Sequence, residues 1–275
     1  MLGHDAPMPN DAAPTAPSIP PRPELRRRVL AGEPTIGLWL GLGSIVATEI
    51  VARAGYDWVV ADLEHGMAGE TELLGQLVAI QGTPTAALVR AMSSELMRVA
   101  RVLDLGADGV VIPRLETVEE VTEALSWMRF PPAGIRGVAA GTRGPGYGTV
   151  PHARLHELNE RITGVFQVES AVAVEAAGDL AAIEGVDVLF IGPADLSHDL
   201  GIPGDFGNPR FTRALDRVAA AAQAHGKAAG ILLQDASEVP AYLARGYRFL
   251  GIGSDYGQVA KGARSQLAAA RQALG

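Results

Sequence analysis

Short apolar runs alternate along the chain with longer stretches in which apolar residues recur every three or four positions. The runs are almost continuously apolar, as expected of parallel strands buried on both faces, and the longer stretches have the period of amphipathic helices. The predicted strands are 36–40, 58–62, 86–90, 109–113, 164–169, 188–192, 229–233 and 249–253. The predicted helices are 44–54, 70–81, 94–105, 117–128, 170–182, 209–225 and 236–245.

Eight strands alternating with helices predict an α/β fold, the (β/α)8 TIM barrel. A chain of 275 residues suits one such barrel, so we expect residues 24–275 to form a single domain. A doubly wound open sheet is the competing topology, because its strands and helices alternate in the same way. In a barrel, functional residues gather on the loops that follow the strands.

Two segments depart from this alternation. Residues 1–23 are rich in proline and alanine and have no apolar core, which predicts a disordered leader rather than a signal peptide. Residues 130–152 hold six Gly and four Pro between the fourth predicted helix of the repeating pattern and the fifth strand. So long an irregular segment is usually functional, and we expect it to arch over the strand ends as a lid.

Composition excludes several classes of protein. The net charge of −8, with basic residues scattered along the chain, argues against a nucleic-acid partner. The absence of cysteine excludes disulfides, zinc–thiolate sites and thiol nucleophiles. No apolar stretch approaches the roughly 20 residues of a transmembrane helix, so no membrane partner is expected and the cytoplasm is the expected location.

Polar side chains are concentrated where the predicted strands end, and the opposite rim shows nothing comparable. If the barrel forms, these side chains meet around its mouth. In chain order they are Trp39, Asp62, Glu64, His65, Arg90, Arg114, Gln167, Glu169, Asp195, Ser254 and Asp255.

Glu169 and Asp195 follow adjacent predicted strands. Two carboxylates at such a short distance repel each other, and the repulsion raises the pKa of one of them. A divalent cation bound between them removes the repulsion. Oxygen ligands favour Mg²⁺ or Mn²⁺. The alternative is that one of the two pairs with an arginine at the rim. The sequence GPADLS (192–197) places a Gly-Pro turn before a short helix, which suits a carboxylate or phosphate, although an ordinary helix start has the same pattern.

The other candidates each have a structural alternative. Arg90 suits a substrate oxyanion, although rim arginines are commonly structural. His65 lies beside two acids that would tune it as a base, although a capping or packed histidine has the same sequence context. Trp39 suits the core better than a ligand-binding wall. The only two lysines, Lys227 and Lys261, do not follow predicted strands, so no Schiff base is expected.

Several segments, in collinear order, resemble the HpcH/HpaI family of class II, metal-dependent pyruvate aldolases. This family cleaves 2-keto-3-deoxy or 4-hydroxy-2-oxo acids into pyruvate and an aldehyde. The resemblance runs from about residue 24 to the C-terminus. The segments are GLWLGLGSIVATEIVARAGYDWVVADLEHG, VIPRLETVEEV, RFPPAGIRGV, FQVES and VDVLFIGPADLSHDLG.

The resemblance implies a role for each candidate. Glu169 and Asp195 would bind Mg²⁺ or Mn²⁺, with Co²⁺ as a further option, and the metal would chelate pyruvate. The implied substrate-binding residues are Trp39, Arg114, Gln167, Gly192, Pro193 and Ala194. Arg90 would stabilise the enolate oxygen. His65 would act as the base, directly or through a metal-bound water, and Asp104 of a neighbouring subunit would pair with it. Asp62 and Glu64 would contact the waters of the metal.

The resemblance also implies a homo-oligomer, a hexamer whose subunits exchange the last helix, and no nucleotide cofactor. The chain departs from the family at Arg114 and Leu233, and the loop VRAMSSEL lacks the Pro, Trp and Asn often found there. These positions contact the aldehyde half of the substrate, so Arg114 suggests an anionic tail, with a surface ion pair as the alternative. A citryl- or malyl-CoA lyase and a non-catalytic binding barrel remain the alternative functions.

Overall fold

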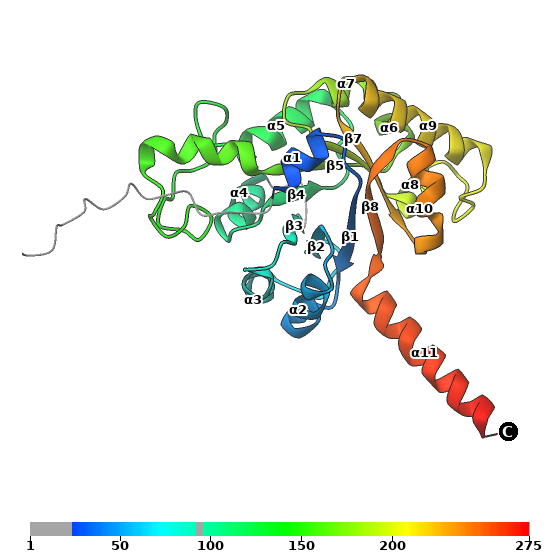
Figure 1. Ribbon diagram of the computed structural model, residues 1–275. Helices are drawn as coiled ribbons and strands as arrows, with labels where there is room; N and C mark the ends of the chain where they lie inside the picture. Colours follow the sequence, from blue (N-terminus) through cyan, green and yellow to red (C-terminus); the bar gives the residue numbers. More distant parts are fainter. Residues whose placement is uncertain (1–23, 92–95, 275) are drawn as a thin grey trace, which may run out of the picture.

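The computed structural model describes residues 24–91 and 96–274, in which eight parallel strands close into a barrel (Figure 1). Each strand pairs with the next, and β8 pairs with β1, which confirms the predicted TIM barrel and excludes the open sheet. The leader 1–23 and the start of the predicted helix 94–105 lie outside the described residues. The strands are β1 Thr35–Leu40, β2 Trp58–Asp62, β3 Ala86–Arg90, β4 Gly109–Ile112, β5 Thr163–Val168, β6 Val188–Ile191, β7 Ala228–Leu233 and β8 Tyr247–Ser254.

Helices connect the strands around the outside of the barrel. Several begin at a side chain that accepts a backbone N–H, as Ser44, Thr117 and Asn208 do. The predicted helix 170–182 is divided in two, and 236–245 begins as a 3₁₀ turn. The helices are α1 Leu25–Leu30, α2 Ile45–Arg53, α3 Glu70–Ile80, α4 Leu96–Asp104, α5 Val118–Met128, α6 Ala171–Glu175, α7 Ala177–Ala182, α8 Pro193–Asp199, α9 Pro209–Ala224, α10 Val239–Ala244 and α11 Asp255–Ala273, with 3₁₀ helices η1 His152–Arg161 and η2 Ala236–Glu238.

Aromatic rings fill the inside of the barrel. Trp58 stacks on Phe249 with ring centroids 4.1 Å apart, and Trp39 packs against both Trp58 and Phe190. Gly37 makes room for this cluster, because a Cβ there would come within 2.0 Å of the Trp58 ring. The site at the barrel mouth therefore rests on a tightly packed aromatic floor.

Three aspartates stabilise the opposite, N-terminal rim. Asp57, Asp108 and Asp187 directly precede β2, β4 and β6. Each accepts a backbone N–H from the start of the preceding strand, at 2.7 to 2.9 Å. Asp187 also binds Arg26 of α1. Sequence reasoning missed this repeat, which serves the closure of the barrel.

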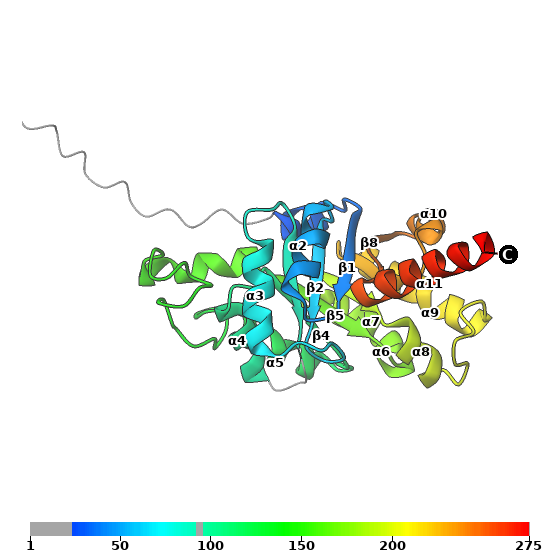
Figure 2. The same cartoon turned by 90° about the horizontal axis from the view of Figure 1, so that it is seen from below.

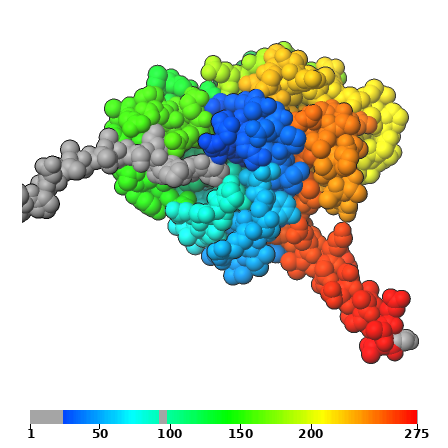
Figure 3. All heavy atoms as spheres, in the orientation of Figure 1, coloured from blue at the N-terminus to red at the C-terminus, as the bar shows by residue number. Residues whose placement is uncertain are grey.

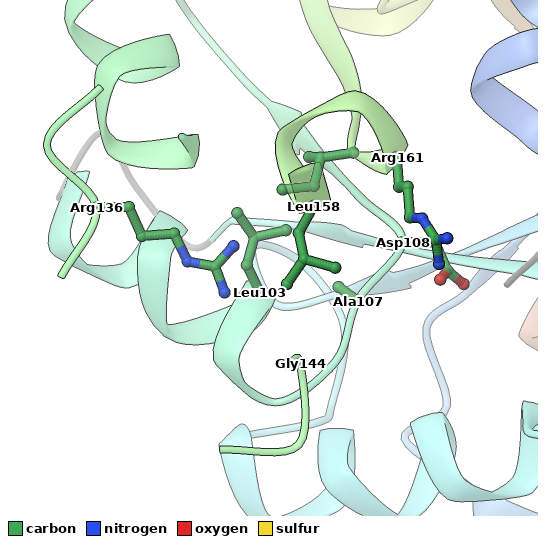
Figure 4. Close-up of a pocket in the computed structure, with 8 residues that line it drawn as sticks. Leu103, Ala107, Asp108, Arg136, Gly144, Leu158 and Arg161 are labelled. Carbon is green, nitrogen blue, oxygen red and sulfur yellow. The ribbon is translucent and has the colours of Figure 1, made fainter. Parts of the chain in front are cut away.

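The glycine-rich segment 130–152 lies at this N-terminal rim, so the prediction of a lid over the mouth is wrong. Arg143 donates to the carbonyls of Leu77 and Leu105, and Gly144 donates to that of Asp104. These carbonyls lie in the last turn of α3, at the end of α4 and directly after it, beside which Figure 4 shows Gly144. The physical reason is topological: a segment that leads from a helix to the next strand must end where that strand begins.

Helix α11 leaves the barrel as a projecting arm (Figures 1 and 3). It starts beside β1 and β8 and then runs away from the body in Figure 1; seen from below, it passes in front of α9 and α10 (Figure 2). Asp255 is its only buried residue. No helix in the described part of the chain has the length and apolarity needed to cross a membrane.

Candidate active site

Glu169 and Asp195 meet at the C-terminal rim, as expected from the adjacent strands that they follow. Glu169 comes directly after β5 and its residue is 8% exposed, whereas the Asp195 side chain in the first turn of α8 is 48% exposed. Both line a cleft of about 320 Å³ that also includes Gln167. The Gln167 amide donates to Oε1 of Glu169 at 2.8 Å, and the backbone of Arg114 favours the ionised form of the same carboxylate, lowering its pKa.

The surroundings of Glu169 oppose its ionisation. Burial is the largest cause, and the negative charges of Asp195 and Glu64 add to it, so that the pKa of Glu169 rises to about 7. Arg90 and the Arg114 backbone oppose this rise without cancelling it. A carboxyl group held in this way between other acids is suited to a cation.

Gly192 provides the surface on which Glu169 lies. A Cβ at this position would come within 2.5 Å of Oε1 of Glu169 and 2.7 Å of its Cγ. The glycine of the GPAD turn therefore positions a carboxylate in addition to any role in binding substrate. Pro193 and Ala194 follow it at the start of α8.

Arg90 is fixed by two carboxylates at the end of β3. Its Nε and Nη2 donate to the two oxygens of Asp62 at 2.9 and 2.6 Å, and Nη1 lies 3.0 Å from Oε2 of Glu64. Burial disfavours an ionised Asp62, but the hydrogen bonds and charge of Arg90 outweigh it and lower the pKa of Asp62 below its ordinary value. The guanidinium is thereby held rigidly, with its position set by β2 and β3.

The loop after β2 is organised by the same aspartate. Oδ1 of Asp62 accepts the backbone N–H groups of Glu64 and His65, at 3.0 and 3.2 Å. The His65 side chain is 61% exposed, and its Nε2 lies 3.9 Å from Oε2 of Glu64. The imidazole therefore stands at the open side of the mouth, next to the carboxylates that hold Arg90.

Arg114 extends across the mouth from the turn after β4. Its Nε lies 3.9 Å from Oε1 of Glu64, and its Nη2 lies 4.0 Å from Oδ1 of Asp195. Its backbone adopts φ +58°, a left-handed conformation that is uncommon for residues other than glycine. Arg114 thus faces both the Arg90 cluster and the Glu169–Asp195 pair.

Two predicted residues lie away from this cluster. Trp39 is 5% exposed and belongs to the aromatic floor inside the barrel. Asp104, at the end of α4, accepts from Arg136 of its own chain at 2.7 Å. Its pairing with His65 between subunits stays a prediction.

Two features of the site were not anticipated from the sequence. His198 lines the cleft one helical turn after Asp195, a spacing that places both on one face of α8 and offers a signal for it. Asp255, noted only as polar, is buried and accepts the backbone N–H groups of Gly41 and Leu42. Asp255 therefore anchors the loop after β1 instead of facing a ligand.

The donor set fits a hard cation. Among the described residues no three His, Asp or Glu side chains are arranged as a metal cluster, so the protein offers two carboxylates. Mg²⁺ is commonly bound in this way, because it retains waters and takes further oxygens from its substrate. Within the described part of the chain, the buried Oε1 of Gln167 has no hydrogen-bond partner, as expected beside bound water or ligand.

Comparison with known proteins gives a consistent result. The model of the family described as HpcH/HpaI aldolase/citrate lyase matches residues 35–262. The 5-keto-4-deoxy-D-glucarate aldolase of Klebsiella pneumoniae subsp. pneumoniae is 37% identical over 85% of this chain and 91% of its own. The crystal structure of an HpcH/HpaI aldolase/citrate lyase family protein from Burkholderia cenocepacia J2315 is 37% identical with a TM-score of 0.85, and covers 90% of this chain and 98% of its own. That of an HpcH/HpaI aldolase from Desulfitobacterium hafniense DCB-2 is 28% identical, also at 0.85, over 90% and 96%.

Proposed function

Because this chain belongs to the HpcH/HpaI aldolase/citrate lyase family, we propose that it is a class II pyruvate aldolase. It reversibly cleaves a 4-hydroxy-2-oxo acid, such as a 2-keto-3-deoxy sugar acid or a dicarboxylic analogue, into pyruvate and an aldehyde. The convergence of Glu169, Asp195 and Arg90 at one rim is the observation that carries this proposal. The likeness to a relative named as an aldolase favours it over an acyl-CoA lyase.

Glu169 and Asp195 would hold a divalent cation, Mg²⁺ or Mn²⁺. When bound, such a cation supplies Lewis acidity toward the 2-oxo and carboxylate oxygens of pyruvate. Gln167 keeps Glu169 in place by its hydrogen bond, and Gly192 gives the carboxylate room. The chain provides no lysine at the mouth, since Lys227 directly precedes β7, at the opposite rim, and Lys261 lies in α11.

Arg90 and His65 carry the charge and the proton in this mechanism. Cleavage of the bond between C3 and C4 leaves the enolate of pyruvate, whose oxygen the Arg90 guanidinium would stabilise. Because Asp62 and Glu64 already fix that guanidinium, it needs little reorganisation as charge develops. His65 would take the proton of the C4 hydroxyl, and its exposed place beside Glu64 suits exchange of that proton with solvent.

Exchange of the methyl protons of pyruvate tests the proposal directly. In D₂O with diamagnetic Mg²⁺, the wild-type protein is expected to remove the methyl signal of pyruvate in NMR spectra, whereas EDTA and Glu169→Ala should abolish the exchange. Full exchange in EDTA would contradict the metal requirement. Borohydride with pyruvate should trap no adduct on lysine. A protein that binds pyruvate without exchange would be a non-catalytic barrel, and cleavage that depends on CoA would indicate the acyl-CoA lyase.

The proposal includes an assembly that exchanges α11 between subunits of a hexamer. In the (β/α)8 pattern, the helix after β8 covers the outside of the barrel next to β1. In this chain α11 leaves that position and exposes Tyr256, Val259 and Leu267. An apolar face of this kind on a projecting helix supports its docking on a second copy.

A further inference from the structure

The guanidinium of Arg114 is the least committed cation at the mouth. Its side chain is 70% exposed, and among the described residues it makes ion pairs only at 3.9 and 4.0 Å, beyond hydrogen-bond length. The Arg90 side chain, in contrast, is 10% exposed, and its guanidinium is already paired with Asp62 and Glu64. The two arginines therefore differ in kind: Arg90 is built into the site, whereas Arg114 has donors available for a ligand.

The backbone at Arg114 is held where that side chain is needed. A left-handed conformation suits glycine and costs free energy for arginine. Arg114 lines the same cleft as Glu169 and Asp195, and its guanidinium lies 4.0 Å from Asp195, so the turn places its side chain beside both predicted metal ligands. An unfavourable conformation retained with a large charged side chain at the mouth points to a function for that side chain.

We propose that Arg114 selects aldehydes that carry a carboxylate, by binding that carboxylate as a two-pronged donor. This inference rests on the proposed aldolase function and deepens it. The aldehyde bonds to the methyl carbon of pyruvate, so it lies next to the place proposed for pyruvate at Glu169 and Asp195. The guanidinium of Arg114, 4.0 Å from Asp195, is near enough to reach the far end of a three-carbon aldehyde.

Arg114 takes no part in the covalent step. In the addition direction, the methyl carbon of pyruvate loses a proton and bonds to the aldehyde carbon, whose oxygen gains a proton. The charge of the distal group does not change. Arg114 would therefore affect the binding and orientation of the anionic aldehyde, and would leave formation of the enolate unaltered.

A matched pair of three-carbon acceptors tests this role. Tartronate semialdehyde ends in a carboxylate where glyceraldehyde ends in a hydroxymethyl group. With pyruvate and Mn²⁺, Arg114→Met is expected to lower kcat/KM for the semialdehyde roughly 10- to 100-fold, mainly through KM. The kcat/KM of Arg114→Met for glyceraldehyde should stay within about threefold of that of the wild-type protein. Arg114→Lys should restore part of the loss for the semialdehyde, because lysine keeps the positive charge but lacks the two parallel N–H donors of a guanidinium.

Two controls separate this role from a general one. Arg217→Met removes a positive charge on α9, where Arg217 pairs with Glu175, and should alter neither acceptor. Exchange of the pyruvate methyl protons in Arg217→Met should match that of the wild-type protein, so that loss of a distant positive charge leaves formation of the enolate intact. An equal loss for both acceptors, or an unchanged preference, would overturn the role of Arg114 and leave the aldolase standing. A wild-type protein without exchange and without either addition would refute the aldolase itself.

Discussion

Replacing Glu169 by glutamine is expected to stabilise the metal-free protein at alkaline pH while removing its function. The variant keeps the size of the side chain and deletes its charge. Glu169 is buried beside Asp195 and Glu64, which is why its pKa rises to about 7 from 4.5. Ionised Glu169 therefore lowers the free energy of unfolding of the metal-free protein, and the site requires it all the same.

The size and sign of the effect follow from the pKa. The difference between about 7 in the folded chain and 4.5 in the unfolded chain corresponds to about 3 kcal/mol. Below pH 4.5 the group is protonated in both states and costs nothing. As the pH rises from 4.5 to about 7, the unfolded chain loses the proton first, so the free energy of unfolding of the wild-type protein falls by that amount.

Urea unfolding in EDTA, followed at pH 5 and pH 8, measures this difference. The free energy of unfolding of Glu169→Gln should exceed that of the wild-type protein by about 2–3 kcal/mol at pH 8 and by much less at pH 5. Glu123→Gln, which removes a charge from the exposed face of α5, should show no such dependence. Equal stability of Glu169→Gln and the wild-type protein at pH 8 would refute the reasoning. Added Mn²⁺ should stabilise only the wild-type protein, by about 2.7 kcal/mol at a hundred times Kd.

Three further predictions concern the rims and the projecting helix. Asp187→Ala should lower the free energy of unfolding by about 3 kcal/mol in urea titrations, because it leaves Arg26 and the Gly164 N–H without their partner; an unchanged midpoint would contradict this. Gly192→Ala should weaken Mn²⁺ binding at least about tenfold in calorimetry, since the new methyl group displaces Glu169, while leaving the melting temperature nearly unchanged. If the proposed hexamer exchanges α11, deletion of residues 256–275 should reduce the mass found by light scattering to that of smaller species; an unchanged mass would remove α11 from the interface.

The strands were predictable from the sequence because parallel strands are buried on both faces and therefore apolar throughout. The strands predicted at 58–62 and 86–90 have the same bounds in the structure, as β2 and β3. The gathering of Glu169 and Asp195 followed from their places after neighbouring strands, without any knowledge of distances. The apolar pattern locates the end of each strand, and in a parallel barrel all of these ends lie at the same rim.

Other features depend on contacts that the local pattern does not contain. The segment 130–152 was expected at the mouth from its composition alone, although its connectivity places it at the opposite rim. The pairing of Asp62 with Arg90 joins residues 28 positions apart and arises only when β2 and β3 lie side by side. The departure of α11 from the barrel leaves no mark in helical periodicity, because an exposed helix and a docked one share the same period.

The rings beneath the site give the protein an internal optical reporter. Trp58 is fully buried and stacked, and Trp39 packs edge-on against it directly below the mouth. In this dry setting their indoles should emit at short wavelength, and opening of the barrel to water should shift that emission to the red. In a Trp127→Phe background, which removes the third, partly buried tryptophan, one fluorescence spectrum can thus establish that the floor of a variant such as Glu169→Gln is intact before any loss of activity is attributed to chemistry.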